Sequence, residues 1–193
     1  HAGPYNFDRE NGALLGWHAN RIAEAKGGSL LVTTSARTPE RAIAAFEAQL
    51  TAPHTLHHFT KFQPEGENPF FAFLGLASEV IVTSDSMSML AEAVASGKPT
   101  HIFDLARGKT SNRPERPKDG SIPKRTLRER LADFRFQAIM YQLGMVALPT
   151  RLTRDVRIIH DTQVEAGRAT WLGRPPRDPN TIPPPLTDLA NAK

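Results

Sequence analysis

The stretch VTSDSMSMLAEAVASGKP, residues 82–99, leads from an apolar segment through small polar residues into an alanine-rich segment closed by Gly-Lys-Pro. The β-branched residues of EVIVTS (79–84) favour a strand. Apolar spacing after Asp85 predicts a helix with one buried side, formed by Met89, Leu90, Ala93 and Val94. A strand, a polar turn and a helix in succession are typical of a parallel α/β sheet, so this stretch decides the predicted fold class.

The first half of the chain repeats this alternation. Helices are predicted at 9–26, 38–50 and 68–77, and further strands at 29–35, 55–59 and 100–105. The first strand is of the kind buried on both faces of a parallel sheet. The second helix has Thr38 as its predicted N-cap and Pro39 as its first residue. We therefore predict an α/β domain with a Rossmann-like parallel sheet flanked by helices.

Composition suggests how the chain is organised around this sheet. With 193 residues, one sizeable core is expected. The predicted parts are a linker and leading helix (1–28), a Rossmann-like nucleotide-binding core (29–106), a basic loop (107–126), C-terminal helices (127–173) and a proline-rich tail (174–193). The C-terminal helices comprise a long amphipathic one that begins near Leu127 and a second at about 154–166.

The absence of cysteine excludes disulfides, a thiol nucleophile and cysteine-ligated metals. No apolar run approaches the length of roughly 18 residues that crosses a bilayer, and the first residues lack the features of a signal peptide. We therefore expect a soluble, cytoplasmic domain, with peripheral attachment to a membrane as an open alternative.

Positive charge is concentrated between residues 107 and 130. This segment has nine basic and three acidic residues, an excess of six, whereas the whole chain has a net charge of +4. Such a segment suits an anionic partner, such as a phosphate, a nucleotide or an anionic membrane surface, but it also fits a solvated surface loop. Nucleic acid is not expected as a partner, because no aromatic residues alternate with the basic ones.

The polar residues after the 79–84 strand are candidates for ligand binding. In open parallel sheets, ligands bind at the carboxyl ends of the strands, where helices begin. Ser88 and Glu92 are one helical turn apart, so unpaired N–H groups of the first turn could receive a phosphate and the Glu92 carboxylate a ribose. Ser and Asp are also ordinary helix caps, but a capping box requires a spacing of three, and Ser88 and Glu92 are four apart.

The SART sequence after the first strand offers a second set of polar groups. Ser35, Arg37 and Thr38 are predicted to face the same sheet edge as Ser86 and Ser88, and an arginine suits a diphosphate. No dinucleotide-binding or P-loop glycine pattern is present, which disfavours an ordinary Rossmann oxidoreductase. The histidines at 54, 57 and 58 do not predict a metal site, because adjacent strand residues face opposite ways.

Three sequence blocks resemble the mitochondrial-fission ELM (elongated mitochondria) family. They are LLVTTSARTPE (30–40), GENPFFAFLGLASEVIVTSDSMSMLAEAVASGKP (66–99) and THIFDL (100–105). That family resembles the GT-B glycosyltransferases, which have two Rossmann-like domains and bind a nucleoside-diphosphate sugar mainly through the C-terminal one. The resemblance implies that this chain is the C-terminal, donor-binding half.

The resemblance implies a donor site that comprises Ser84, Asp85, Ser86, Ser88 and Glu92. The full predicted substrate-binding set is Ser35, Arg37, Thr38, Asn68, Ser84, Asp85, Ser86, Ser88 and Glu92. No metal or other cofactor is expected, since GT-B enzymes commonly work without one. The acceptor domain, which usually supplies the catalytic base, is expected to be missing, so the catalytic residues are unknown and the chain alone should bind without turnover. The alternative is a non-enzymatic module that recruits partners or an anionic membrane through the basic loop.

Overall fold

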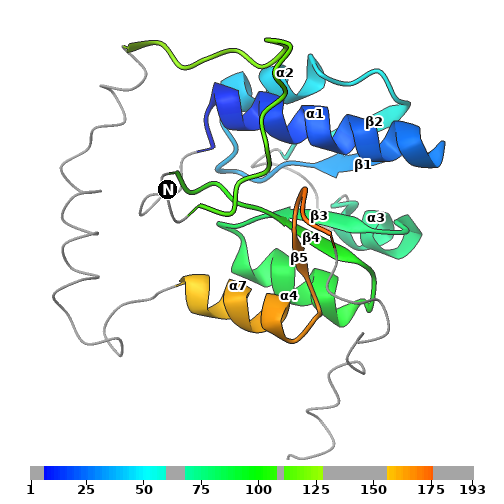
Figure 1. Ribbon diagram of the computed structural model, residues 1–193. Coiled ribbons are helices and arrows are strands. Elements are labelled where there is room, and N and C mark those ends of the chain that lie inside the picture. Colours follow the sequence, from blue (N-terminus) through cyan, green and yellow to red (C-terminus); the bar gives the residue numbers. More distant parts are fainter. Residues whose placement is uncertain (1–6, 60–67, 108–110, 128–155, 176–193) are drawn as a thin grey trace, which may run out of the picture. The chain divides into compact units, whose positions relative to one another are not determined.

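The computed structural model describes residues 7–59, 68–107, 111–127 and 156–175. These residues form an α/β fold with parallel strands in two sheets flanked by helices (Figure 1). The predicted α/β class and Rossmann-like arrangement of parallel strands are therefore confirmed. The chain divides into two compact units, one formed by residues 1–73 and 115–154 and the other by residues 74–114 and 155–193.

The first unit contains a two-stranded parallel sheet and the helices α1 and α2. Strand β1 (Leu30–Thr33) pairs with β2 (His54–His57), with Leu30 opposite His54 and Thr33 opposite His57. Helix α1 (Arg9–Lys26) has the predicted bounds, and α2 spans Glu40–Glu47. The Asp8 side chain accepts a hydrogen bond from the Asn11 N–H, and Gly27, at φ 59°, ends α1 in the left-handed conformation that favours glycine.

Small residues form the buried face of α1, which packs closely against α2. The buried residues of α1 are Asn11, Gly12, Ala13, Leu14, Gly16, Ala19, Asn20 and Ala23. A Cβ atom at Gly12 or Gly16 would overlap the carbonyl oxygen of Ala42 or Phe46 in α2, respectively. Leu14, Leu15, His18 and Ile22 recur at helical spacing in the sequence, but only Leu14 is buried. Backbone-to-backbone packing selects the glycine and alanine face instead of the face with the larger side chains.

Two local predictions for the first unit need correction. Helix α2 begins at Glu40 with Pro39 as its N-cap, one residue later than expected. The Thr38 hydroxyl does not cap it, because its oxygen accepts a hydrogen bond from the Ser35 N–H at 3.0 Å. Leu31 in β1 is 36% exposed, so this strand is not enclosed on both faces as its apolar sequence suggested.

The second unit contains a three-stranded parallel sheet with its own core. The strands β3 (Val80–Thr83), β4 (Thr100–Phe103) and β5 (Thr170–Trp171) are hydrogen-bonded in the order β3-β4-β5. Helices α4 (Met87–Ala95) and α7 (Val156–Glu165) lie on the same side of this sheet (Figure 1). The buried core residues are Val82, Leu90, Ala93, Ile102, Ala169 and Trp171.

Helix α3 (Phe70–Leu76) lies where the two units meet in the sequence, and none of its seven residues is fully buried. The Lys98 ammonium donates hydrogen bonds to the carbonyl oxygens of Leu74, Gly75 and Ala77 at 2.6, 2.6 and 2.5 Å. The last carbonyl oxygens of a helix have no hydrogen-bond donors within the helix. The Lys98 ammonium supplies donors here and so caps the C-terminal end of α3.

The C-terminal part of the second unit differs from the prediction. Helix α7 ends at Glu165, and Thr170–Trp171 then pairs with His101–Ile102 of β4 as a parallel strand, which the sequence did not indicate. The amphipathic helix expected to begin near Leu127 and most of the proline-rich tail lie outside the described residues. Among the helices that the structure does describe, none is both long and apolar enough to cross a membrane.

Candidate functional site

The second unit contains polar residues where β3 and β4 end. Thr83 is paired with Phe103, so Ser84 and Asp104 follow adjacent parallel strands at one edge of the sheet. Ser84 is 1% exposed, and its hydroxyl accepts a hydrogen bond from the Leu105 N–H at 3.0 Å. Ser84 thus joins the two strand ends, and its hydroxyl is engaged within the protein.

The first turn of α4 lies beside this edge. Ser86 is its N-cap residue, but the Ser86 side chain makes no capping hydrogen bond, in contrast to Asp8 at α1. Ser88 is exposed and Glu92, one turn later, is half-buried, while Leu90 and Ala93 on the other side are buried. Of the predicted buried side, Leu90 and Ala93 are buried, and Met89 and Val94 are partly buried against the same core. The helix begins at Met87, two residues after Asp85, where it was expected to begin. The N–H groups in the first turn of a helix can bind an anion where the N-cap side chain does not accept their hydrogen bonds.

Asp104 is a residue of this edge that the sequence analysis missed. It is 4% exposed, and its carboxylate accepts hydrogen bonds from the N–H groups of Ala106 at 2.8 Å and Asn112 at 2.6 Å and from the Ser111 hydroxyl at 3.2 Å. Three hydrogen bonds compensate the burial of this carboxylate. Asp104 therefore ties the start of the basic segment to the end of β4. Its position directly after a strand was the signal that could have identified it.

The predicted residues of the first unit form a compact turn after β1. The hydroxyl oxygens of Ser35 and Thr38 are 3.2 Å apart, and the Arg37 N–H donates to the Ser35 hydroxyl at 3.3 Å. Arg37 itself is exposed. Asn68 accepts a hydrogen bond from the Phe70 N–H at 3.1 Å and so helps to begin α3. Ser35, Arg37, Thr38 and Asn68 belong to the first unit and the remaining predicted residues to the second, so a common site for both sets stays a prediction.

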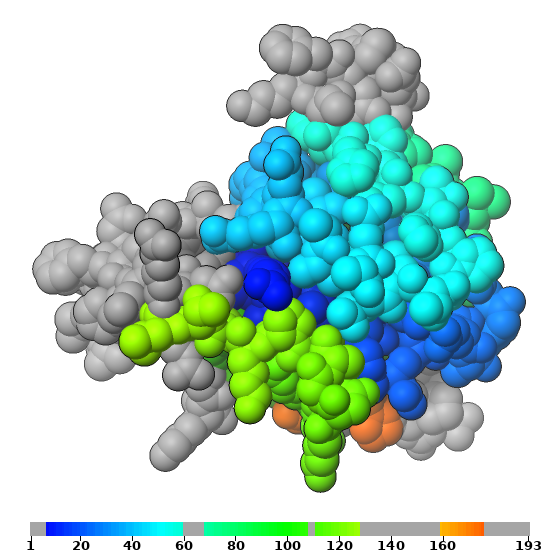
Figure 2. Space-filling view, turned by 90° about the horizontal axis from the view of Figure 1, so that it is seen from above, coloured from blue at the N-terminus to red at the C-terminus, as the bar shows by residue number. Residues whose placement is uncertain are grey.

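Part of the basic segment is paired with α1. Arg116 contacts the Glu10 carboxylate at 2.8 Å and also donates to the Ile122 carbonyl, and Arg125 contacts the Asp8 carboxylate at 3.1 Å. Figure 2 shows this part of the basic segment, in yellow-green, near the dark blue start of α1. Among the described residues, at least two of the positive charges of this segment are therefore paired with carboxylates, which leaves less charge for an external anion than the sequence indicated. Lys118 and Lys124 are exposed.

A second polar cluster lies near the amino ends of the strands in the second unit. The His101 imidazole contacts the Glu79 carboxylate at 3.1 Å through Nε2 and the Thr170 hydroxyl at 3.0 Å through Nδ1. Glu79 directly precedes β3, His101 lies in β4 and Thr170 in β5, so the cluster links all three strands. It lies toward the opposite end of the strands from Ser84. In the described part of the chain, no group of three or more histidines and acidic residues could hold a metal ion.

The parallel strands define an α/β protein with a Rossmann-like arrangement. Its polar residues lie at the carboxyl edge of the sheet, where β3 and β4 end and α4 begins. The chain belongs to the mitochondrial fission ELM1 family, whose model matches residues 2–119. It is similar to the uncharacterized protein RP120 of Rickettsia prowazekii (strain Madrid E), with 28% identity over 99 residues. This match covers 51% of the chain and 28% of the relative, so the chain spans less than two thirds of the relative's length. No solved structure matches the chain.

Proposed function

We propose that this chain binds a nucleoside-diphosphate sugar at the carboxyl edge of the second unit's sheet. The observation that carries the proposal is the first turn of α4, whose N-cap side chain makes no capping hydrogen bond. The diphosphate would accept hydrogen bonds from these N–H groups and from the exposed Ser88 hydroxyl. The Glu92 carboxylate, one turn further, would accept hydrogen bonds from the ribose hydroxyls.

The activity proposed for the complete protein is glycosyl transfer. Its acceptor and catalytic base would come from a domain outside this chain, as in the two-domain glycosyltransferases that the family resembles. In that reaction the start of α4 would stabilise the negative charge that develops on the departing diphosphate. Without the acceptor domain, the expected activity of this chain is binding alone.

The proposal can be tested by NMR titration of the ¹⁵N-labelled chain with UDP, GDP, ADP and CMP. We expect saturable shifts of the Ser86, Ser88 and Met89 amides with at least one nucleoside diphosphate. Glu92→Ala should weaken that binding by roughly 10-fold or more, since a hydrogen bond to a charged group is lost. Glu47→Ala, which removes an exposed glutamate from α2, should leave the affinity unchanged.

The alternative, a module that recruits an anionic membrane through the basic segment, predicts a different result. In that case no nucleotide would shift the α4 amides. The chain would instead sediment with vesicles that contain phosphatidylserine, and the replacement of Lys118 and Lys124 by glutamine would reduce this binding. Absence of any response of α4 to all four nucleotides would rule out the nucleotide-sugar proposal.

A further inference from the structure

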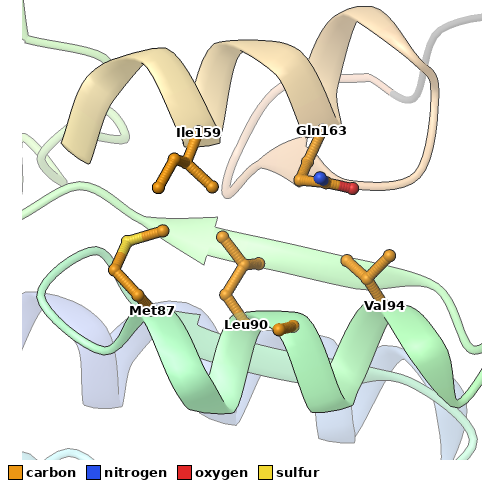
Figure 3. Close-up of a pocket in the computed structure, with 6 residues that line it drawn as sticks. Met87, Leu90, Val94, Ile159 and Gln163 are labelled. Atoms are coloured by element: carbon orange, nitrogen blue, oxygen red, sulfur yellow. The ribbon is translucent and has the colours of Figure 1, made fainter. Parts of the chain in front are cut away.

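Two adjacent strands of the second unit end at the same edge of the sheet, and the chain continues from each into residues that can bind an anion. Thr83 of β3 is paired with Phe103 of β4, so both continuations begin at this edge. The first leads into α4 and the second into the basic segment. Figure 3 shows Met87, Leu90 and Val94 of α4 directed toward α7, so apolar packing holds α4 in place on the sheet.

Asp104 and Ser111 fix the backbone that leads out of β4. The Asp104 carboxylate accepts a hydrogen bond from the Ala106 N–H at 2.8 Å, and the Ser111 hydroxyl donates one to the Ala106 carbonyl oxygen at 2.8 Å. Both polar backbone groups of Ala106, which is 8% exposed, are thus held within the protein. Arg107 follows directly and is exposed. Its backbone is therefore anchored at the sheet edge, while its side chain is accessible to a ligand.

The proposed nucleotide site needs a positive charge that its own side chains do not supply. The residues predicted there on β3 and α4 are three serines, Asp85 and Glu92, and none of these is basic. The Asp104 carboxylate is 4% exposed and accepts three hydrogen bonds, so its charge is compensated by groups of the protein itself. An arginine can bind a phosphate through two parallel hydrogen bonds, and Arg107 is the basic residue that follows β4 most closely in the sequence.

We propose that Arg107 binds the diphosphate together with the first turn of α4, and that Asp104 is a positioning residue for Arg107. This inference rests on the proposed function and narrows its ligand class. Neighbouring strands of a sheet are about 4.8 Å apart, so anion-binding groups that follow two adjacent strands suit two linked phosphates better than a single one. One phosphate accepts hydrogen bonds from the N–H groups of α4, and the other from the Arg107 guanidinium.

Inorganic pyrophosphate and orthophosphate test this inference without a base or a ribose. In NMR titrations of the ¹⁵N-labelled full chain, we expect pyrophosphate to shift the Ser86 and Ser88 amides and the Arg107 Nε–H. It should bind roughly 10-fold more tightly than orthophosphate, because a second set of charge-assisted hydrogen bonds is made. Arg107→Gln should remove this preference. Lys118→Gln, which removes one charge from an exposed position of the same basic segment, is the matched control and should keep the preference.

A second pair of variants tests the positioning role. Asp104→Asn should weaken pyrophosphate binding, and Ser111→Ala, which leaves the buried carboxylate in place, should weaken it roughly 2- to 10-fold through the loss of one neutral hydrogen bond. In the Arg107→Gln background, Ser111→Ala should have no further effect, because both changes act through Arg107. Additive effects of these two substitutions would overturn the positioning role.

The same titrations distinguish this inference from the proposed function. Equal pyrophosphate affinities of Arg107→Gln and the unmodified chain, with the α4 amides still responding, would overturn the role of Arg107 and leave the nucleotide proposal intact. Absence of any α4 response to pyrophosphate and to UDP, GDP and ADP would overturn both.

Discussion

Gly12 shows how a single missing side chain determines helix packing. Its position has no room for a Cβ atom, because the Ala42 carbonyl of α2 occupies that space. A backbone oxygen cannot move away as a flexible side chain can, so Gly12→Ala must displace one of the two helices. We expect a loss of about 1–3 kcal/mol in the free energy of unfolding, as for other overpacked cores, and a lower Tm in calorimetry.

Gly75 in α3 provides the control for this prediction. A Cβ atom there would meet no other atom within 4 Å, so Gly75→Ala should leave the Tm unchanged or raise it slightly. Equal melting temperatures for Gly12→Ala and the unmodified chain would show that α1 and α2 do not pack this closely.

His18 gives stability a dependence on pH. Burial lowers the pKa of His18 below its ordinary value of 6.5, the positive charge of Arg21 lowers it further, and the hydrogen bond to the Glu115 carbonyl opposes the shift. The unfolded chain therefore binds a proton at this site more readily than the folded chain. The stabilisation is fully present above pH 6.5 and is lost as the pH falls through the lower folded-state pKa.

Urea unfolding at pH 7.5 and pH 5 measures this dependence. His18→Gln should show a smaller decrease in the free energy of unfolding between the two pH values than the unmodified chain. His58→Gln, which replaces an exposed histidine, should keep the decrease of the unmodified chain. An identical decrease in His18→Gln would assign the pH dependence to other groups.

At the scale of the element, α3 depends on a lysine that is distant in sequence. The Lys98 ammonium is the donor for three carbonyls at the end of this helix. Lys98→Met keeps most of the apolar stem but leaves these carbonyls to water, at a cost of about 1.5–3 kcal/mol for hydrogen bonds to a charged group. We expect faster amide hydrogen exchange in a peptide that covers residues 70–77.

Lys124→Met is the control, since Lys124 is an exposed residue of the first unit. It should leave the exchange of the 70–77 peptide unchanged. If Lys98→Met also left this exchange unchanged, another group would have to close the C-terminal end of α3.

At the scale of the whole molecule, the second unit has a hydrophobic core built from its own residues, and this core predicts a local response to core substitution. Trp171, which is 8% exposed, packs in the core of the second unit with Val82 and Ile102. Trp171→Ala should cost about 3–5 kcal/mol through lost burial and the resulting cavity. Hydrogen exchange should rise in β3 and β4 much more than in α1. An equal rise in α1 would show that the two units unfold as one cooperative whole.

The sequence alone predicted those features that depend on neighbours along the chain. The bounds of α1, the alternation of strands and helices and the buried side of α4 follow from capping residues and from the spacing of apolar side chains. The polar cluster from Ser84 to Ser88 was likewise placed correctly after a strand, because small polar residues between a strand and a helix are a local pattern. The roles predicted for these residues in ligand binding stay predictions.

The tertiary structure alone decided which distant groups meet. It selected the glycine and alanine face of α1 for burial against α2, added β5 beside β4 and paired Arg116 with Glu10. It also gave Asp104 and Lys98 their hydrogen-bond partners across the chain. The physical reason is that periodicity describes one helix or strand at a time, whereas close packing and the compensation of buried charges depend on residues that only folding brings together.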